Sequence, residues 1–218
     1  MDRKNCIVEF LGTLILVATV VGSGIMAQQL SGGNNAIALL GNTVATGAIL
    51  VVLISVFGPL SGAHFNPVVS AVMAARGSLK LQHLLPYVVC QIVGGVLGTC
   101  LAHAMFDLPV LQVSSTMRWG LHQWLAEAVA TSGLLLVIIL ASRNANSNVA
   151  LLVGLYITAA YWFTSSTSFA NPAVTLARAL TDTFSGIAPG SVLPFIASQI
   201  IGAALAHHFA RFLVTPDQ

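Results

Sequence analysis

The pair Asn-Pro occurs twice inside apolar sequence, as Asn66-Pro67-Val68 in SGAHFNPVVS and as Asn171-Pro172-Ala173 in SFANPAVTLA. Asparagine can cap a helix, and proline is tolerated at the first helical position because it has no N–H to lose. The stretches that begin at these pairs, 66–76 and 171–181, are too short to cross a bilayer. A helix of about ten residues covers about 15 Å, half of the hydrocarbon core. The two motifs therefore predict two half-helices that meet inside a membrane.

The composition of the whole chain is also typical of a membrane protein. Charged residues make up 6% of it, apolar residues 56%, and the mean hydropathy is +0.90, whereas a soluble domain carries about 25% charged residues. A secretory signal would explain one apolar run only, and the first run has no evident cleavage site. Six runs are long enough to span a bilayer: 7–27, 36–58, 84–106, 120–141, 149–167 and 191–213. We expect an all-α membrane protein of six transmembrane helices and two re-entrant half-helices.

The basic residues predict the orientation. With a cytoplasmic N-terminus, two of the 8 Lys and Arg residues, Arg118 and Arg178, fall outside. The other basic residues then fall inside: Arg3, Lys4, Arg76, Lys80, Arg143 and Arg211. The positive-inside rule therefore predicts that both termini are cytoplasmic. We expect a multi-pass protein of the cell (inner) membrane. The net charge of +2 and the lack of a basic stripe predict no nucleic-acid partner.

The two halves of the sequence repeat each other. LPYVVCQIVGG at 85–95 matches LPFIASQIIGA at 193–203, and VEFLGT around Glu9 echoes AEAVAT around Glu127. Each half has three spans and one half-helix, and since three is odd the second half is inserted upside down. We expect one channel domain over 1–218, with inverted repeats of approximately 1–106 and 120–218. Such repeats place a solute site near the midplane.

These motifs resemble the major intrinsic protein family, the aquaporins and aquaglyceroporins. The resemblance rests on both Asn-Pro motifs, SGAHFNP before the first, and matching acidic and amide residues in the spans: Glu9, Glu127, Gln91 and Gln199. It covers essentially the whole length. It implies a right-handed six-helix bundle, one pore per protomer, a homotetramer in the lipid bilayer, and two asparagines that donate hydrogen bonds to solute at mid-membrane.

Physical chemistry supports that role for Asn66 and Asn171. A helix N-terminus carries about half a positive charge, so two of them pointing at one spot repel cations, while the asparagines hold the oxygen of a water or hydroxyl. The alternative is that each asparagine only caps its helix. Val68 replaces the alanine usual in the family, and we interpret it as a packing variant.

The family's outer constriction, the selectivity filter, indicates the solute. The resemblance places it at Thr46, Ala159, Ser168 and Val174. Water-selective members carry an aromatic residue at the first of these positions, a histidine at the second and an arginine at the fourth. Arginine has five donors and a fixed charge, whereas valine is small and apolar. A wider ring predicts passage of water, glycerol, urea and neutral metalloid acids such as arsenous acid. The pattern is similar to divergent bacterial members associated with arsenic resistance.

Other residues leave alternatives open. Tyr156, Trp162 or a loop residue would restore a narrow, water-selective pore by filling the gap. Arg178 lies one helical turn beyond Val174, where it would either place a charge in the outer vestibule or snorkel to the interface and pair with Asp182.

The remaining candidates are polar residues within the spans and loops. His64 is expected near the cytoplasmic pore wall, as a hydrogen-bonding residue or a gate. Intramembrane carboxylates are functional or paired by default. By resemblance, Glu9 and Glu127 are expected to hydrogen-bond the loop backbones that carry the Asn-Pro motifs, and Gln91 and Gln199 to brace the same loops.

The sequence predicts no enzyme. It contains no nucleophile with an adjacent base, no phosphate loop and no metal cluster, and its three cysteines form no CxxC pair. We therefore expect neither cofactor nor metal. The serious rival to a passive channel is a coupled secondary transporter, which normally needs a titratable group at the midplane, and neither asparagine titrates.

Overall fold

The computed structural model describes residues 3–214, so residues 1–2 and 215–218 lie outside the description. The described chain is helical. Its elements are α1 Arg3–Leu30, α2 Asn35–Ser61, α3 Pro67–Ala75, the 3₁₀ helix η1 Leu81–His83, α4 Leu84–Met105, α5 Leu121–Ala141, α6 Val149–Phe163, α7 Pro172–Arg178 and α8 Pro189–Leu213. Six long helices and two half-helices confirm the predicted class.

One span is shorter than predicted. Five helices are long and apolar enough to cross a membrane, but α6 has 15 residues and ends at Phe163, not at residue 167. Its end has a local cause: Thr164 takes an extended backbone, and its hydroxyl donates to the carbonyl of Ala160 at 2.6 Å. A 15-residue helix is about 22 Å long. The irregular chain after it continues to Asn171.

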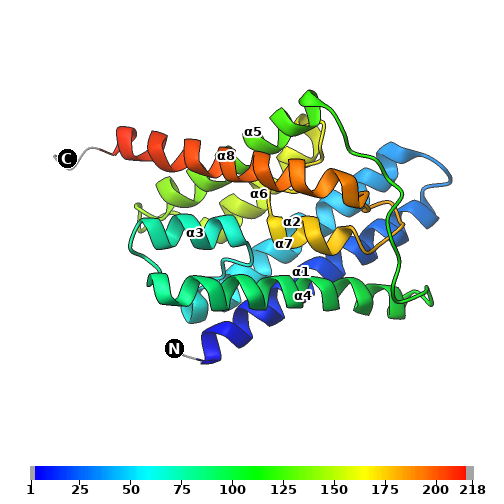
Figure 1. The fold of residues 1–218 in the computed structure, drawn as a ribbon, viewed down its shortest axis with the longest axis horizontal. Coiled ribbons are helices and arrows are strands. Elements are labelled where there is room, and N and C mark those ends of the chain that lie inside the picture. Colours follow the sequence, from blue (N-terminus) through cyan, green and yellow to red (C-terminus); the bar gives the residue numbers. More distant parts are fainter. Residues whose placement is uncertain (1–2, 215–218) are drawn as a thin grey trace.

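The half-helices α3 and α7 lie end to end in the middle of the bundle (Figure 1). Asn66 and Asn171 are their N-caps: the Oδ1 atom of Asn66 accepts from the N–H of Val68, and that of Asn171 accepts from the N–H groups of Ala173 and Val174. The prolines occupy the first helical turn. α7 ends at Arg178, before the predicted residue 181.

The inverted repeat shows in the helix pairing. α1 packs along α4 and α5 along α8, while α2 and α6 join the two halves. Small residues permit the close approach. A Cβ atom on Gly94 would touch the carbonyl of Phe10, and one on Gly202 would touch the carbonyl of Ala128 in the same relation. Gly98, one turn after Gly94, packs equally closely on α1.

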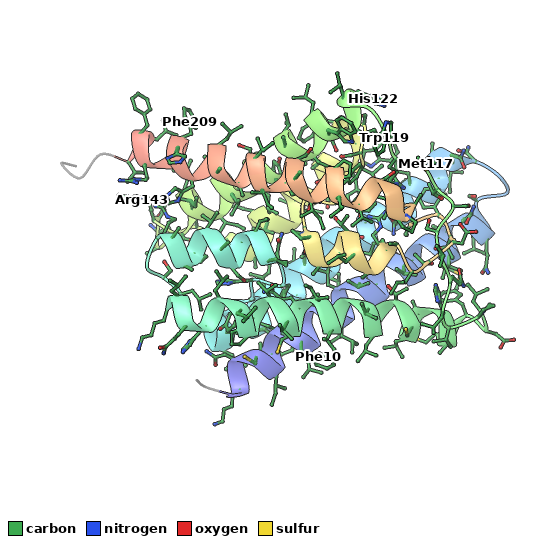
Figure 2. The ribbon with its side chains drawn as sticks, in the orientation of Figure 1. Phe10, Met117, Trp119, His122, Arg143 and Phe209 are labelled. Carbon is green, nitrogen blue, oxygen red and sulfur yellow. The ribbon has the colours of Figure 1, made fainter. Side chains whose placement is uncertain are left out.

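The two ends of the bundle differ. α1 begins and α8 ends at the same end (Figure 1), and Arg143 and Phe209 lie toward that end in Figure 2. Met117, Trp119 and His122 lie toward the opposite end (Figure 2). The outward faces of the long helices are apolar and exposed, as lipid requires. We call the end that holds the start of α1 and the end of α8 the terminal end, and the opposite end the distal end.

Candidate pore

One cavity of about 590 Å³ runs past the tips of both half-helices. At the terminal end it is lined by Asn5, Lys80 and His83, and at the distal end by Thr46, Val174 and Arg178. Asn66 and Asn171 line it between these ends. The cavity therefore connects the two regions in which the sequence predicts pore residues.

The two asparagines bind each other's loops. The Nδ2 atom of Asn66 donates to the carbonyl of Ala170 at 2.8 Å, and that of Asn171 donates to the carbonyl of Phe65 at 2.8 Å. Ala170 and Phe65 each immediately precede the other half's asparagine. A carboxamide nitrogen carries two N–H donors, so one donor on each asparagine is used within the protein. The second has no acceptor among residues 3–214, so it remains for a molecule in the cavity.

The loops before the asparagines have an unusual backbone. The residues one and three positions before each asparagine are left-handed, with φ of 49° at Ala63, 49° at Phe65, 51° at Ser168 and 48° at Ala170. Non-glycine residues seldom adopt this region because Cβ approaches the following carbonyl. No residue type here signals such a conformation, so the sequence does not predict it.

Glu9 holds the first of these loops. Its carboxylate is fully buried and accepts from the N–H of His64 at 3.0 Å and of Phe65 at 2.7 Å. The Nε2 atom of Gln91 donates to the same carboxylate at 2.8 Å and to Ser70 at 2.9 Å. These hydrogen bonds fix the backbone of the loop before Asn66 to α1.

Glu127 holds the second loop in the same way. It is fully buried and accepts from the N–H of Phe169 at 2.8 Å and of Ala170 at 2.9 Å. The Nε2 atom of Gln199 donates to Glu127 at 2.6 Å and to Thr175 at 2.9 Å. Because loop N–H groups face both carboxylates, these carboxylates act as structural anchors.

The distal part of the cavity differs from the expectation at one position. Thr46, Ser168 and Val174 line it, but Ala159 is exposed on the outer face of α6 and does not. Tyr161 lines the cavity instead. The family spacing misplaces this residue because it assumes a fixed length between α6 and Asn171.

The periodicity of α6 identifies which of its residues line the cavity. Val153, Ile157 and Tyr161 recur every four residues, so they share one helix face, and all three are buried and line the cavity. The hydroxyl of Tyr161 donates to Oγ1 of Thr46 at 3.3 Å, and Thr46 itself donates to the carbonyl of Asn42. The buried hydroxyl of Ser168 has no partner among the described residues.

The two aromatic residues considered as fillers of this region lie elsewhere. The hydroxyl of Tyr156 donates to the carbonyl of Ala130 at 3.0 Å, and its ring covers Gly133 on α5. The side chain of Trp162 is 50% exposed on the surface. Neither lines the cavity, so that alternative is wrong for both residues.

Arg178 is buried at the distal end of the cavity, with 2% of its surface exposed. Its guanidinium carbon lies 3.4 Å from the ring centroid of Phe169, and its Nε–H donates to the carbonyl of Ser185. Asp182 instead accepts from the N–H and the hydroxyl of Ser115, both at 2.8 Å. The interpretations of Arg178 as a snorkelling residue or as the partner of Asp182 are therefore wrong.

His64 and Val68 occupy different surroundings. His64 lines the cavity, where its Nδ1 lies 3.0 Å from the hydroxyl of Ser70 and its ring contacts Tyr87 edge-on. Val68 is buried in one hydrophobic cluster with Leu135 and Ala203 and does not line the cavity. Pro67, Pro172 and Ala173 do not line the cavity either.

A bundle of inverted repeats, with two half-helix tips meeting beside one cavity whose lining residues come from both ends of the bundle, is the architecture of a membrane channel. The sequence profile described as Major intrinsic protein matches residues 2–168. The chain belongs to the major intrinsic protein family, a family of channels.

Individual relatives agree with this assignment. The chain is 54% identical over 213 residues to aquaglyceroporin AqpS of Rhizobium meliloti (strain 1021), covering 98% of this chain and 91% of that protein. It is 37% identical over 99 residues to aquaporin-8 of Notomys alexis, covering 45% of this chain and 36% of that protein. The X-ray structure of the aquaglyceroporin from Plasmodium falciparum superposes with a TM-score of 0.80 at 20% identity, over 99% of this chain and 98% of that one. This last likeness concerns the fold alone.

Proposed function

We propose that the chain is a passive channel for water and small uncharged solutes, among them glycerol, urea and arsenous acid. The observation that carries this proposal is the small apolar Val174 at the distal end of the cavity, where water-selective members of the family have an arginine. The name aquaglyceroporin of the relative from Rhizobium meliloti supports a pore that admits glycerol.

The asparagines supply the recognition of these solutes. Asn66 and Asn171 each retain one N–H that faces the cavity, and a hydroxyl or water oxygen accepts such a donor. Neither side chain titrates, so transport through this site needs no proton or ion. Solute moves down its own gradient.

A second candidate is a water-selective pore, and one contact favours it. Tyr161 and Thr46 meet at 3.3 Å beside the cavity, which brings a bulky ring to a region expected to be open. A narrow neck at Tyr161 would admit water and exclude glycerol.

Stopped-flow measurements on proteoliposomes separate the candidates. Water, glycerol, urea and arsenous acid are tested in parallel, with empty liposomes as the control. Flow of all four supports the wide pore, and flow of water alone supports the narrow one. Loss of solute flow when ion and proton gradients are removed would instead indicate a coupled transporter.

We also propose the setting in which the channel works. The whole chain, 1–218, forms one channel domain, the exposed apolar helix faces contact lipid and neighbouring copies in a homotetramer, and the terminal end faces the cytoplasm of the cell (inner) membrane. Lys80 and Arg143 at that end support this orientation by the positive-inside rule. Crosslinking in the membrane and protease protection of a C-terminal tag test the assembly and the orientation.

A further inference from the structure

Arg178 has donors that the protein does not use. Its guanidinium lies against the face of Phe169, and its Nε–H binds Ser185. Within residues 3–214 its four Nη–H donors have no acceptor, and Arg178 forms no ion pair. The side chain lines the cavity, so these donors are left for what enters it.

A second cation strengthens the positive charge of this region. The guanidinium carbon of Arg118 lies 5.0 Å from the ring centroid of Phe169, which therefore contacts both arginines. Arg118 donates to the carbonyls of Gly186 at 2.9 Å and Ser166 at 3.4 Å, and it does not line the cavity. Its charge reinforces that of Arg178, while its donors bind the protein.

Among residues 3–214 no carboxylate forms an ion pair with either arginine. Glu127 is near enough to attract both electrostatically, but its oxygens accept from loop N–H groups and Gln199, and Asp182 binds Ser115. One carboxylate therefore faces two cations. Burying a charge without a partner is costly, and an anion that supplies the missing charge recovers part of that cost.

We propose that Arg178 forms a binding subsite for small monovalent oxyanions of the carboxylate type at the distal end of the cavity. The planar fork of the guanidinium matches two oxygen atoms on one centre, and the resulting charge-assisted pair is stronger than a neutral hydrogen bond. The subsite deepens the proposed function, on which it rests: an anion bound there stands in the path of neutral solutes.

Direct binding tests the subsite without any measurement of transport. Trifluoroacetate is titrated into the purified full-length protein in neutral detergent, and its ¹⁹F line width is followed, with trifluoroethanol as the uncharged control. We expect saturable broadening for trifluoroacetate and its reversal by sodium acetate, but none by acetamide. Equal binding of trifluoroethanol, or no saturation by trifluoroacetate, would overturn the proposal.

Four variants locate the site. Arg178→Met keeps the length of the side chain and should weaken trifluoroacetate binding about tenfold or more, since one charge-assisted hydrogen bond contributes about that factor. Arg178→Lys should retain an intermediate affinity. Arg118→Met removes a supporting charge whose donors bind the protein, so it should weaken binding less than Arg178→Met does. Arg143→Met, toward the terminal end, is the matched control and should leave the affinity near that of the parent. Unchanged affinity in Arg178→Met would overturn the proposal. If that variant fails to fold, the acetate and acetamide competition on the parent protein decides.

The test of the anion subsite and the test of the proposed channel function can fail independently of each other. Glycerol flow in liposomes tests the channel, and anion binding in detergent tests the subsite. Glycerol flow without trifluoroacetate binding would reject the subsite alone, whereas binding without glycerol flow would reject the solute range alone.

Discussion

The hydroxyl of Tyr161 lies 3.3 Å from Oγ1 of Thr46, and this contact joins α6 to α2 beside the distal part of the cavity. The two residues come from different repeats. The width of the proposed neck therefore depends on how the two halves of the chain meet.

Removing the ring should widen the neck. Tyr161→Ala is expected to raise glycerol and urea permeability relative to water, because the side chain lines the cavity. Tyr161→Phe, which keeps the ring and loses the hydrogen bond, is the matched control and should change the ratio little. Stopped-flow light scattering measures the three permeabilities, and an unchanged ratio in Tyr161→Ala would place the narrowest point elsewhere.

Adding an arginine should narrow the neck. Val174→Arg is expected to suppress glycerol, urea and arsenous acid more than water, since arginine adds bulk and a fixed charge. Val174→Ala adds neither and should leave the selectivity near that of the parent. The same swelling assay applies, and an unaltered solute ratio in Val174→Arg would show that this position does not limit passage.

Neutralising a loop anchor should destabilise the protein. Glu127→Gln weakens charge-assisted hydrogen bonds to two loop N–H groups, each worth about 1.5–3 kcal/mol. Glu9→Gln should cost at least as much, because Glu9 accepts from the two equivalent N–H groups and also from the hydroxyl of Ser61 at 2.7 Å. Thermal unfolding in detergent measures both. A stable variant that has lost solute flow would argue for a direct transport role of the carboxylate.

Close helix packing gives a stability prediction with a built-in control. Gly202→Ala should cost about 1–3 kcal/mol, because the new methyl group meets the backbone carbonyl of Ala128. Gly58→Ala in α2 adds the same methyl group where nothing lies within 4 Å, so it should be tolerated. Unfolding temperatures of the two variants should differ, and equal values would mean that α5 and α8 can move apart freely.

Asp182 should make the stability of its contact with Ser115 sensitive to acid. Hydrogen bonds from the N–H and the hydroxyl of Ser115 lower the pKa of Asp182 below its ordinary value. A lowered pKa in the folded state adds stability above the unfolded pKa of about 3.9, and this stability is lost as the pH falls through the folded value. The difference in unfolding temperature between the parent and Asp182→Asn should therefore be present at neutral pH and shrink below about pH 4. A difference independent of pH would exclude the carboxylate's charge as its cause.

Much of the fold is predictable because the decisive residues act locally or by repetition. Asn66 and Asn171 cap the helices that follow them, so their sequence context suffices to place α3 and α7. Glu9, Glu127, Gln91 and Gln199 recur at equivalent places in the two halves, and the structure brings each glutamate to the glutamine of its own half.

The distal part of the cavity is less predictable because it depends on loop geometry. Ala159 is misplaced by two residues relative to Tyr161, since the path from the end of α6 to Asn171 is not fixed by spacing. Arg178 has Asp182 one helical turn ahead, yet α7 ends at Arg178 and Asp182 binds Ser115 instead. Tertiary contacts with Phe169 and Ser185, which no local pattern encodes, decide its position.

The exchange of hydrogen bonds between the asparagine tips also bears on how the chain is made. Asn66 needs the carbonyl of Ala170, a residue synthesised long after it, and Asn171 needs that of Phe65. The first re-entrant segment therefore reaches its final bonding only once the second has entered the bilayer. Biogenesis of the pore is in this sense a single late event, shared by both halves, and a ribosome stalled before Ala170 would leave α3 without its partner.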